Sequence, residues 1–295
     1  MLSKSLTLTL LCVVAGANGV LASPLPAAPR CPIFPTNSPW NQPIDTKPIA
    51  PASDALIASI GLEAGLHPDF SNQGGYGIPI NVVGRRIPRQ RIRSFTYPVE
   101  SDRVAYPIPA RPLVEGGSDR HMLLVDRDAC RLYELFGAER SGTGWKAGSG
   151  ATWDLRSNRL RTDGWTSADA AGLPILPGLA RYDEVRRGVI DHALRFTAPR
   201  TGAAHIAPAR HDAGSGDSNL PPMGLRVRLK ASVAIGGYGP QARVVLTALK
   251  RYGMILADNG SPWYVTGAPN RGWNDDDLHR LGEIHGSDFE VVAAG

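Results

Sequence analysis

Short apolar runs separated by turn residues dominate the chain between residues 76 and 234. The runs include INVVG, IRSFTYPV, HMLLVD, RLYELF and LRVRLKASV, and Gly, Pro, Asp and Ser lie between them at irregular intervals. Runs of this length, rich in β-branched and aromatic residues, are typical of β-strands. The pattern predicts a mainly β protein, namely an antiparallel β-sandwich or jelly roll with a few peripheral helices.

Helical periodicity is confined to three stretches outside this region. A helix is expected from Ser53, a second begins at Pro240 and ends at Gly253, and a short third follows Asn274. Proline at the first helical position and glycine just past the last one are common helix boundaries. No change of composition divides the later chain, so residues 53–295 are expected to form a single domain.

The first 22 residues have the pattern of a secretory signal peptide. Lys4 precedes a long apolar run, and Val20-Leu21-Ala22 offers a cleavage site. An uncleaved membrane anchor is the alternative. Residues 23–52 are rich in proline and are expected to form an extended arm across the domain. No later stretch provides the roughly 20 apolar residues that a membrane span needs. We therefore expect a secreted or periplasmic monomer, not bound to a membrane after cleavage.

Cysteine usage agrees with export. Removal of Cys12 leaves Cys31 and Cys130, which are expected to form a disulfide in an oxidising compartment. Neither belongs to a zinc-binding pattern, and the acidic loop that holds Asp212 and Asp217 lacks the spacing of a calcium loop. We expect no metal.

Several chemistries and partners are disfavoured by the absence of their motifs. The chain has no nucleotide-binding glycine motif, so no cofactor is expected, and it has no nucleophile elbow and no HExxH. The formal charge of +5 is mild, and the basic clusters lack the interleaved aromatic residues of a nucleic-acid surface. Nucleic acid is therefore not an expected partner.

The stretch DRHMLLVDRDACRLYELFG reads as a hairpin that carries two ionisable residues on an apolar face. A two-residue turn, or a four-residue loop over DRDA, would place His121 opposite Glu134, with their β-carbons about 5 Å apart. Burial raises the pKa of a carboxyl group and a neighbouring imidazolium lowers it, a combination that acid/base sites use. The alternative is a buried ion pair that organises the core, and a three- or five-residue loop would abolish the pairing.

A second group lies in RYDEVRRGVIDHALRF. In the expected strand VIDHALRF, His192 shares a face with apolar residues, and Arg181, Asp183 and Glu184 precede a turn at Gly188. A single histidine of this kind is commonly a satisfied core residue. Together with His121, however, it indicates a shared cleft.

A third group is aromatic. Trp145, Trp153 and Trp165 lie among small polar residues, and Asp154, Asp163 and Asp169 are additional carboxylates in the same region. Tryptophan faces commonly stack on sugar rings, although these residues would equally close the edge of a sandwich. Paired carboxylates about 5 to 9 Å apart are the signature of glycosidases.

These observations favour a secreted glycoside hydrolase that acts on an extracellular polysaccharide by carboxylate acid/base catalysis. Glu134 would be the acid or nucleophile, and its carboxylate partner would be Asp154, Glu184 or Asp183. His121 and His192 would tune charge or hold sugar hydroxyls, and Arg181 would orient a carboxylate. The expected subsites are Trp145, Trp153 and Trp165. The alternatives are a polysaccharide lyase acting on an acidic glycan and a non-catalytic glycan-binding or cell-surface protein.

Several long phrases resemble an uncharacterised family of secreted bacterial proteins. The phrases are SPWNQPI, DRHMLLVDRDACRLYELF, GWTSADAAGLPILPGLARYDEVRRGVIDHALRF and ALKRYGMILADNG. The resemblance covers most of the chain after the predicted signal peptide. It implies export but supplies no substrate and no catalytic residue.

Overall fold

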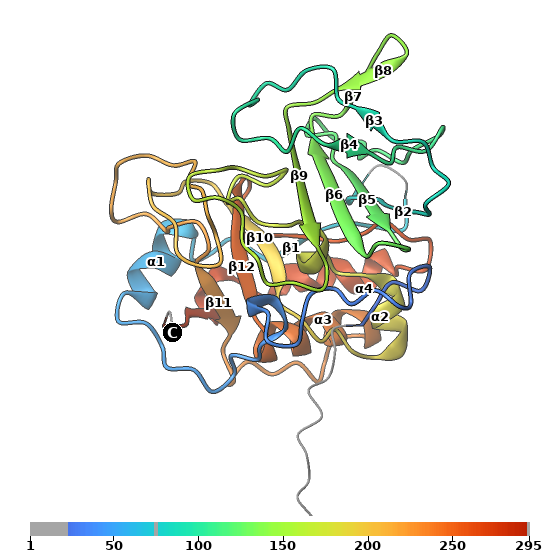
Figure 1. Cartoon of the computed structure of the whole chain (residues 1–295). Helices are drawn as coiled ribbons and strands as arrows, with labels where there is room; N and C mark the ends of the chain where they lie inside the picture. The colour runs from blue at the N-terminus through green and yellow to red at the C-terminus, as the bar shows by residue number, and fades with distance from the viewer. Residues whose placement is uncertain (1–22, 74–75, 294–295) are drawn as a thin grey trace, which may run out of the picture.

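The structure is a computed structural model that describes residues 23–73 and 76–293. The predicted signal peptide, residues 1–22, lies outside the described residues. The protein is a mixed α/β fold with two principal open sheets (Figure 1). The six-stranded sheet has the order β1 (His67–Asp69), β13 (Tyr264–Thr266), β10 (Leu194–Ala198), β12 (Met254–Asn259), β11 (Arg226–Leu229), β14 (Phe289–Val291). The four-stranded sheet has the order β2 (Ile80–Val83), β5 (Met122–Asp126), β6 (Arg131–Phe136), β9 (Ser149–Asp154).

Two small sheets and several helices complete the described part of the chain. The small sheets pair β3 (Gln90–Arg91) with β4 (Ala105–Tyr106) and β7 (Glu139–Ser141) with β8 (Gly144–Lys146). The α-helices are α1 (Ser53–Ile60), α2 (Tyr182–Arg187), α3 (Pro240–Arg251) and α4 (Asp275–His279). Short 3-10 helices span Pro39–Asn41, Leu176–Gly178, Arg280–Glu283 and Gly286–Asp288. Helices are thus confirmed at all three expected places.

The expectation of an antiparallel sandwich is met only in part. Strands β10 and β12, β1 and β13, and β2 and β5 pair in parallel, and no clear sandwich is formed. The chain between β10 and β12 contains β11 and α3, and a long connection of this kind allows the two strands to run in the same direction. A run of apolar residues does not distinguish parallel from antiparallel pairing, and the connections decide it.

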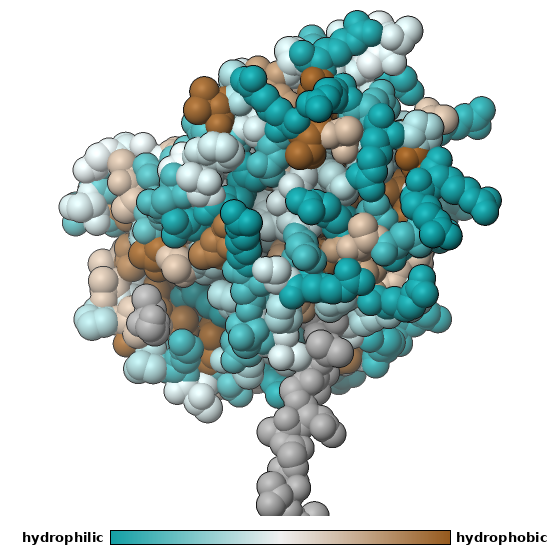
Figure 2. Space-filling model, in the orientation of Figure 1, coloured by the Kyte–Doolittle hydropathy of each residue, from teal (hydrophilic) through white to brown (hydrophobic). Residues whose placement is uncertain are grey.

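Both principal sheets pack against apolar clusters. Helix α3 packs Val245, Leu246 and Leu249 into the same core as β10 and β12. All five residues of β5 are buried, because Leu123 faces one apolar cluster and Leu124 faces another. In Figure 1 the four-stranded sheet occupies the upper part of the molecule and helices α2, α3 and α4 the lower part. Figure 2 shows the same face, on which hydrophilic residues dominate and hydrophobic residues form small scattered groups.

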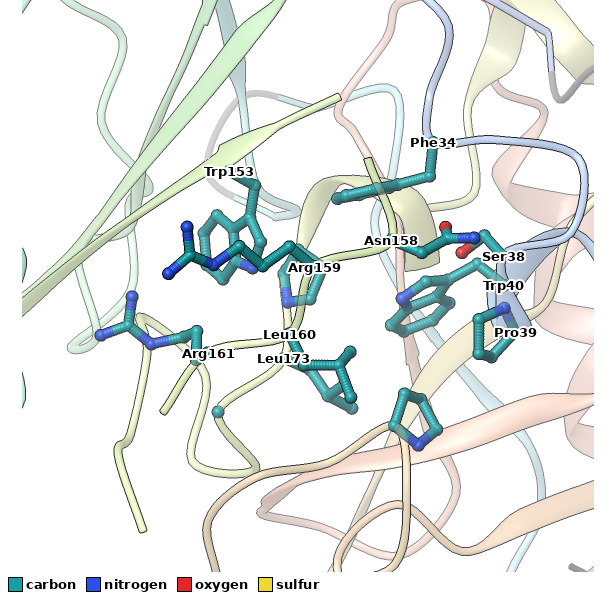
Figure 3. Close-up of a pocket in the computed structure, with 13 residues that line it drawn as sticks. Phe34, Ser38, Pro39, Trp40, Trp153, Asn158, Arg159, Leu160, Arg161 and Leu173 are labelled. Carbon is teal, nitrogen blue, oxygen red and sulfur yellow. The ribbon is translucent and has the colours of Figure 1, made fainter. Parts of the chain in front are cut away.

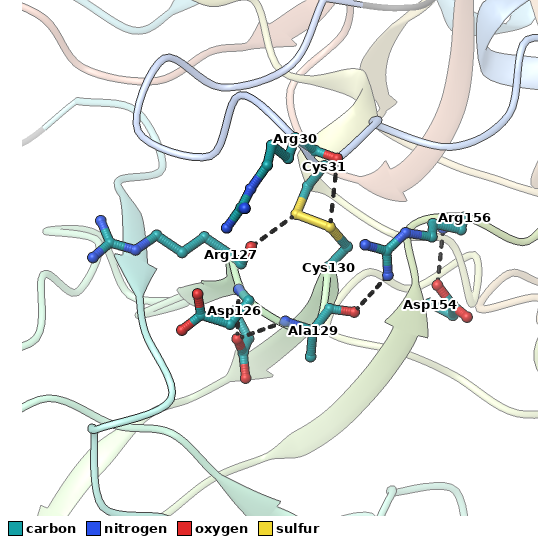
Figure 4. The surroundings of a disulfide bond; sticks show 9 residues. Arg30, Cys31, Asp126, Arg127, Ala129, Cys130, Asp154 and Arg156 are labelled. Atoms are coloured by element: carbon teal, nitrogen blue, oxygen red, sulfur yellow. Dashed lines mark hydrogen bonds between the residues drawn. A yellow bond between two sulfur atoms is a disulfide. The ribbon is translucent and has the colours of Figure 1, made fainter.

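The N-terminal arm is fastened to the four-stranded sheet. The predicted disulfide between Cys31 and Cys130 is present and joins positions 99 residues apart (Figure 4). Leu25, Ile33 and Phe34 of the arm are buried in the cluster that also holds Cys130. The arm is therefore part of the core, as its apolar residues require.

The hairpin of β5 and β6 differs from the expected register by two residues. Asp126 pairs with Arg131, so the loop is residues 127–130, and Leu123 rather than His121 lies opposite Glu134. Two features lengthen the loop: Asp126 Oδ1 accepts the N–H groups of residues 128 and 129, and Cys130 has a left-handed backbone with φ 49°. The predicted His121–Glu134 pair is therefore wrong. Because the shift is even, both side chains remain on the predicted face.

Candidate active site

A pocket of about 350 Å³ opens between the two principal sheets and is lined by several ionisable side chains. Strands β6, β9 and β12 each contribute one end, and the loops before β4, before β5, after β9 and after β10 supply the rest. The carboxylates that line this acidic pocket are Glu100, Asp119, Asp169 and Asp258. The other polar residues that line it are Tyr97, Ser149, Thr166, Ser167, His211 and Asn259.

Asp258 stands at the carboxyl end of β12. The four residues before it are fully buried and fix the strand between β10 and β11, so that Asp258 is the first side chain of the strand to reach the pocket. Its side chain is 24% exposed. Burial, reinforced by the charge of Asp169 and opposed by that of Arg195, raises the pKa of Asp258 to about 7. Asp258 can therefore carry a proton at neutral pH.

Beneath Asp258 lies a buried ion pair. Arg195 of β10 donates two hydrogen bonds to Asp169, from Nε over 2.9 Å and from Nη2 over 2.6 Å. Its Nη1 donates to the hydroxyl of Thr266 on β13, and Nη2 also lies 3.9 Å from Asp258 Oδ2. Burial lowers the pKa of Arg195, but the carboxylate of Asp169 outweighs it and the pKa lies above its usual value. One guanidinium nitrogen thus lies near both aspartates, and the two charge-assisted hydrogen bonds fix the geometry of Asp169.

Glu100 is a second partly exposed carboxylate of the pocket, with a side chain that is 32% exposed. Asp119, at the rim of the same pocket, is exposed. Glu100 Oε2 accepts the N–H of Thr166 over 3.0 Å and lies 3.8 Å from His211 Nε2. His211 Nδ1 lies 2.7 Å from the carbonyl oxygen of Ala170, which requires a proton on Nδ1. In the neutral ring Nε2 is then free to accept a proton in the pocket.

His121 supports the loop that lines the pocket. It is buried, its Nδ1 lies 2.7 Å from Glu115 Oε2, and its Nε2 lies 3.0 Å from the carbonyl oxygen of Ala168. Both partners are acceptors, which favours the doubly protonated ring. Burial lowers the pKa of His121, but the hydrogen bond and charge of Glu115 outweigh it, so the pKa is raised. His121 therefore anchors Ala168, next to Asp169, and does not face the pocket itself.

Glu134 is fully buried and is not among the residues that line the acidic pocket. Its carboxylate accepts the N–H groups of Ile175 over 2.9 Å and of Leu176 over 2.9 Å, where the short helix Leu176–Gly178 begins. Burial raises the pKa of Glu134 to about 7, although these two hydrogen bonds oppose the shift. The structure gives Glu134 a role in holding this loop against the four-stranded sheet.

Replacing Glu134 with glutamine is expected to flatten the pH dependence of stability without loss of activity. The folded-state pKa is raised, so the stability that Glu134 contributes is complete below its unfolded pKa of 4.5 and is lost as the pH rises through about 7. The loss amounts to at most about 3 kcal/mol in the free energy of unfolding. Urea unfolding of both proteins between pH 4 and pH 8 measures the difference. An identical pH dependence in the variant would contradict this role.

Arg181, Glu184 and His192 form a second buried group. Arg181 Nη2 donates to Glu184 Oε1 over 2.6 Å, and His192 Nε2 lies 3.2 Å from Glu184 Oε2. Asp183 is 3.6 Å from Arg181 Nε. Burial raises the pKa of Glu184, but the charges of Arg181 and His192 outweigh it and leave the pKa below its usual value. Within the described residues, no hydrogen bond or ion pair connects this group to His121 or Glu134, so the predicted ionisable residues form two groups.

The predicted aromatic subsites are divided as well. Trp153 and Trp165 line a groove of about 450 Å³ together with Asp154, whereas Trp145 is buried in the apolar cluster of β4 and β8 beneath Arg140. The cations that line this arginine–tryptophan groove are Arg131, Arg159 and Arg161. Figure 3 shows the small pocket that adjoins the groove, with Trp153 and the two arginines Arg159 and Arg161 on one side and Trp40 on the other.

Arg161 forms the wall between the groove and the acidic pocket. Its guanidinium lies 5.8 Å from the ring centre of Trp153 and 5.7 Å from that of Trp165. Nη2 donates to the carbonyl oxygen of Glu100 over 2.7 Å, and Nε donates to that of Thr166 over 2.9 Å. Glu100 and Thr166 line the acidic pocket, so the two depressions are neighbours that share one layer of residues.

Sequence reasoning missed three of the residues on which this site depends. Asp258 follows the apolar run MILA, and a polar residue at the end of a buried strand is a position where α/β sheets place ligand-binding groups. That signal was available in the sequence. No comparable signal marks Glu100 or His211, which lie on loops brought together by the fold.

Comparisons with protein-family models, with curated proteins and with solved structures find no match to this chain. In the described part of the chain, no helix is long and apolar enough to cross a membrane. Residues 23–73 and 76–293 contain no cluster of three or more side chains suited to hold a metal ion.

Proposed function

We propose that the protein is a secreted glycoside hydrolase that cleaves an extracellular polysaccharide in the acidic pocket. The observation that carries the proposal is Asp258, a carboxyl group with a pKa of about 7 that shares the pocket with the partly exposed side chain of Glu100. Glycoside hydrolysis requires one protonated and one ionised carboxyl group on either side of the scissile bond. Asp258 and Glu100 are the two carboxyl groups of the pocket to which we assign these roles.

Asp258 would act as the proton donor. As the bond between the anomeric carbon and the leaving oxygen breaks, the Asp258 proton passes to that oxygen. Glu100 removes a proton from the water that forms the new bond to the anomeric carbon, or attacks that carbon itself. Asp169 and Arg195 act on Asp258 through their charges in this scheme, because Asp169 raises its pKa and Arg195, 3.9 Å away, opposes that shift.

The arginine–tryptophan groove supports a polysaccharide as the substrate. Trp165 is half-buried and offers aromatic surface for a sugar ring, whereas Trp153 is 6% exposed and contributes only an edge of the groove. Arg131 and Arg159 are exposed cations suited to carboxylate or sulfate groups. A chain bound in the groove would lie beside the acidic pocket, because only the layer of residues around Arg161 separates the two. The proposed substrate is therefore an acidic glycan.

A lyase is the second candidate, and the same arginines favour it. In that reaction His211 Nε2 would remove the proton beside a uronic acid carboxylate that an arginine neutralises. The two reactions differ in their products. Incubating the protein with a panel of acidic and neutral glycans is expected to release new reducing ends without ultraviolet-absorbing unsaturated ends. Unsaturated ends would establish the lyase, and binding without any product would establish a non-catalytic glycan-binding protein.

Replacing Arg159 with alanine is expected to raise KM for an anionic polysaccharide about tenfold and to leave kcat nearly unchanged. No side-chain partner holds Arg159 among the described residues, so its charge is available to the substrate. A loss of about 1.4 kcal/mol of binding corresponds to that factor. The matched control is Arg271→Ala, an exposed arginine that does not line the groove. If both variants have the same KM at low ionic strength, the groove does not bind the anionic substrate.

A further inference from the structure

Ser23 is held in the interior of the protein by three polar contacts. Its backbone nitrogen donates to Asp191 Oδ1 over 3.2 Å, and its hydroxyl donates to Asp191 Oδ2 over 3.2 Å. Its carbonyl oxygen accepts a hydrogen bond from Arg181 Nη2 over 2.6 Å. Ser23 is only 6% exposed. Such a complete set of partners is unusual for a residue in a proline-rich arm.

Asp191 is a buried carboxylate that lacks a cation among the described residues. It is 5% exposed, and both of its oxygens are directed at Ser23. Arg181 Nη2 donates to Glu184 and to the Ser23 carbonyl oxygen, and His192 Nε2 lies 3.2 Å from Glu184, so neither side chain forms an ion pair with Asp191 among the described residues. A buried carboxylate is costly unless a positive charge accompanies it. The geometry around Asp191 therefore has a place for one cation, at the position of the Ser23 nitrogen.

We propose that the protein is cut between Ala22 and Ser23 and that the new α-ammonium group of Ser23 forms an internal ion pair with Asp191. In the cut, which a signal peptidase would make, water adds across the peptide bond. Ala22 keeps a carboxylate, and the Ser23 nitrogen becomes an ammonium. An α-amino group has an ordinary pKa of about 8, so it is charged at neutral pH. The cleavage position expected from the sequence thus coincides with the residue whose nitrogen faces Asp191.

This ion pair would couple maturation to the buried core. Ser23 bridges Asp191 to Arg181 and Glu184, and the disulfide at Cys31 holds the other end of the same short segment. Asp191 also precedes β10, the strand that carries Arg195 beneath the acidic pocket. The inference does not depend on the reaction proposed for that pocket.

The first test is the position and accessibility of the new N-terminus. Trypsin cuts after Arg30, so the exported protein is expected to yield the peptide Ser23–Arg30. Trypsin does not cut after Ala22, so the N-terminus of this peptide would report the earlier cleavage. An amine-acylating reagent is expected to leave this peptide unlabelled in the folded protein and to label it after denaturation. A different first residue overturns the cleavage position, and equal labelling in both states overturns the internal ion pair.

The second test measures the coupling between the ammonium and Asp191. Two mature chains are released from the same cleavable fusion. One starts at Ser23, and the other has a single alanine before Ser23. Each chain is prepared with and without the substitution Asp191→Asn. The substitution is expected to lower Tm by about 10 °C in the chain that starts at Ser23 and by clearly less in the extended chain. Asp45→Asn, an exposed aspartate of the same arm, is the matched control. Equal losses in both chains would overturn the pair.

Discussion

Replacing Asp258 with asparagine is expected to reduce kcat for glycan hydrolysis about a thousandfold, with little change in KM. The amide keeps the size of the side chain but cannot release a proton to the leaving oxygen, and general acid catalysis is commonly worth 10²–10⁴-fold. Arg195 still holds Asp169 in the variant, so the pocket should keep its shape. Initial rates on the substrate identified from the glycan panel measure the effect.

The pH dependence of the wild-type enzyme tests the same role independently. Asp258 is the acid in its protonated form, and its pKa is raised to about 7. The value of kcat/KM is therefore expected to fall to about half of its plateau value near pH 7, where Asp258 is half deprotonated, and to fall about tenfold for each pH unit well above pH 7. The Asp258→Asn variant should lack this fall, because its residual activity does not require the proton.

A matched substitution separates the loss of the acid from a general effect on folding. Asp276→Asn, on an exposed side of α4 and away from the pocket, should keep full activity. Glu100→Gln should lose activity comparably to Asp258→Asn, since it removes the second carboxylate. The assignment of Asp258 as the general acid would be refuted if the kcat of Asp258→Asn were within twofold of the wild-type value. It would also be refuted if the wild-type kcat/KM did not change with pH through pH 7.

The hairpin of β5 and β6 shows how far the sequence predicts local structure. Alternation correctly placed His121 and Glu134 on one face, and cysteine counting correctly predicted the disulfide. The register depended on the loop, and the loop depended on hydrogen bonds to the Asp126 side chain and a left-handed residue at Cys130. These contacts involve single atoms, and apolar alternation carries no information about them.

The candidate site was less accessible to sequence reasoning than the fold. The ionisable residues singled out from apolar strands, His121, Glu134 and His192, proved to be buried and satisfied by internal partners. A charged residue on the apolar face of a strand is buried, and a buried side chain cannot contact a substrate. The accessible groups, Glu100 and His211, lie on loops between strands, and only the tertiary arrangement shows that their side chains meet.

Buried charges as well as accessible ones determine the pKa of Asp258 in the pocket. Asp169 is inaccessible, yet its charge contributes to keeping Asp258 protonated. Arg195 limits that effect, because it contacts both aspartates through one nitrogen. The pKa of the proposed acid is therefore set by a pair that never needs to touch the substrate.

Replacing Arg195 with methionine is expected to lower the free energy of unfolding by about 4 kcal/mol. Methionine fills much of the volume, but it leaves Asp169, whose side chain is fully buried, without its two charge-assisted hydrogen bonds. Removing one partner of a buried ion pair commonly costs 3–5 kcal/mol, because the remaining charge stays desolvated. Urea unfolding followed by circular dichroism measures the loss.

The double variant Arg195→Met with Asp169→Leu identifies the cause of that loss. If the cost arises from the stranded charge, removing Asp169 as well should restore much of the stability, and the two single losses should not add. Arg280→Met is the control, because its partner Glu283 lies on the surface and the pair is exposed to solvent. Its unfolding curve should overlay that of the wild type. Additive losses in the double variant would show that Arg195 stabilises the protein through packing, and the pocket aspartates would then have to be positioned by other contacts.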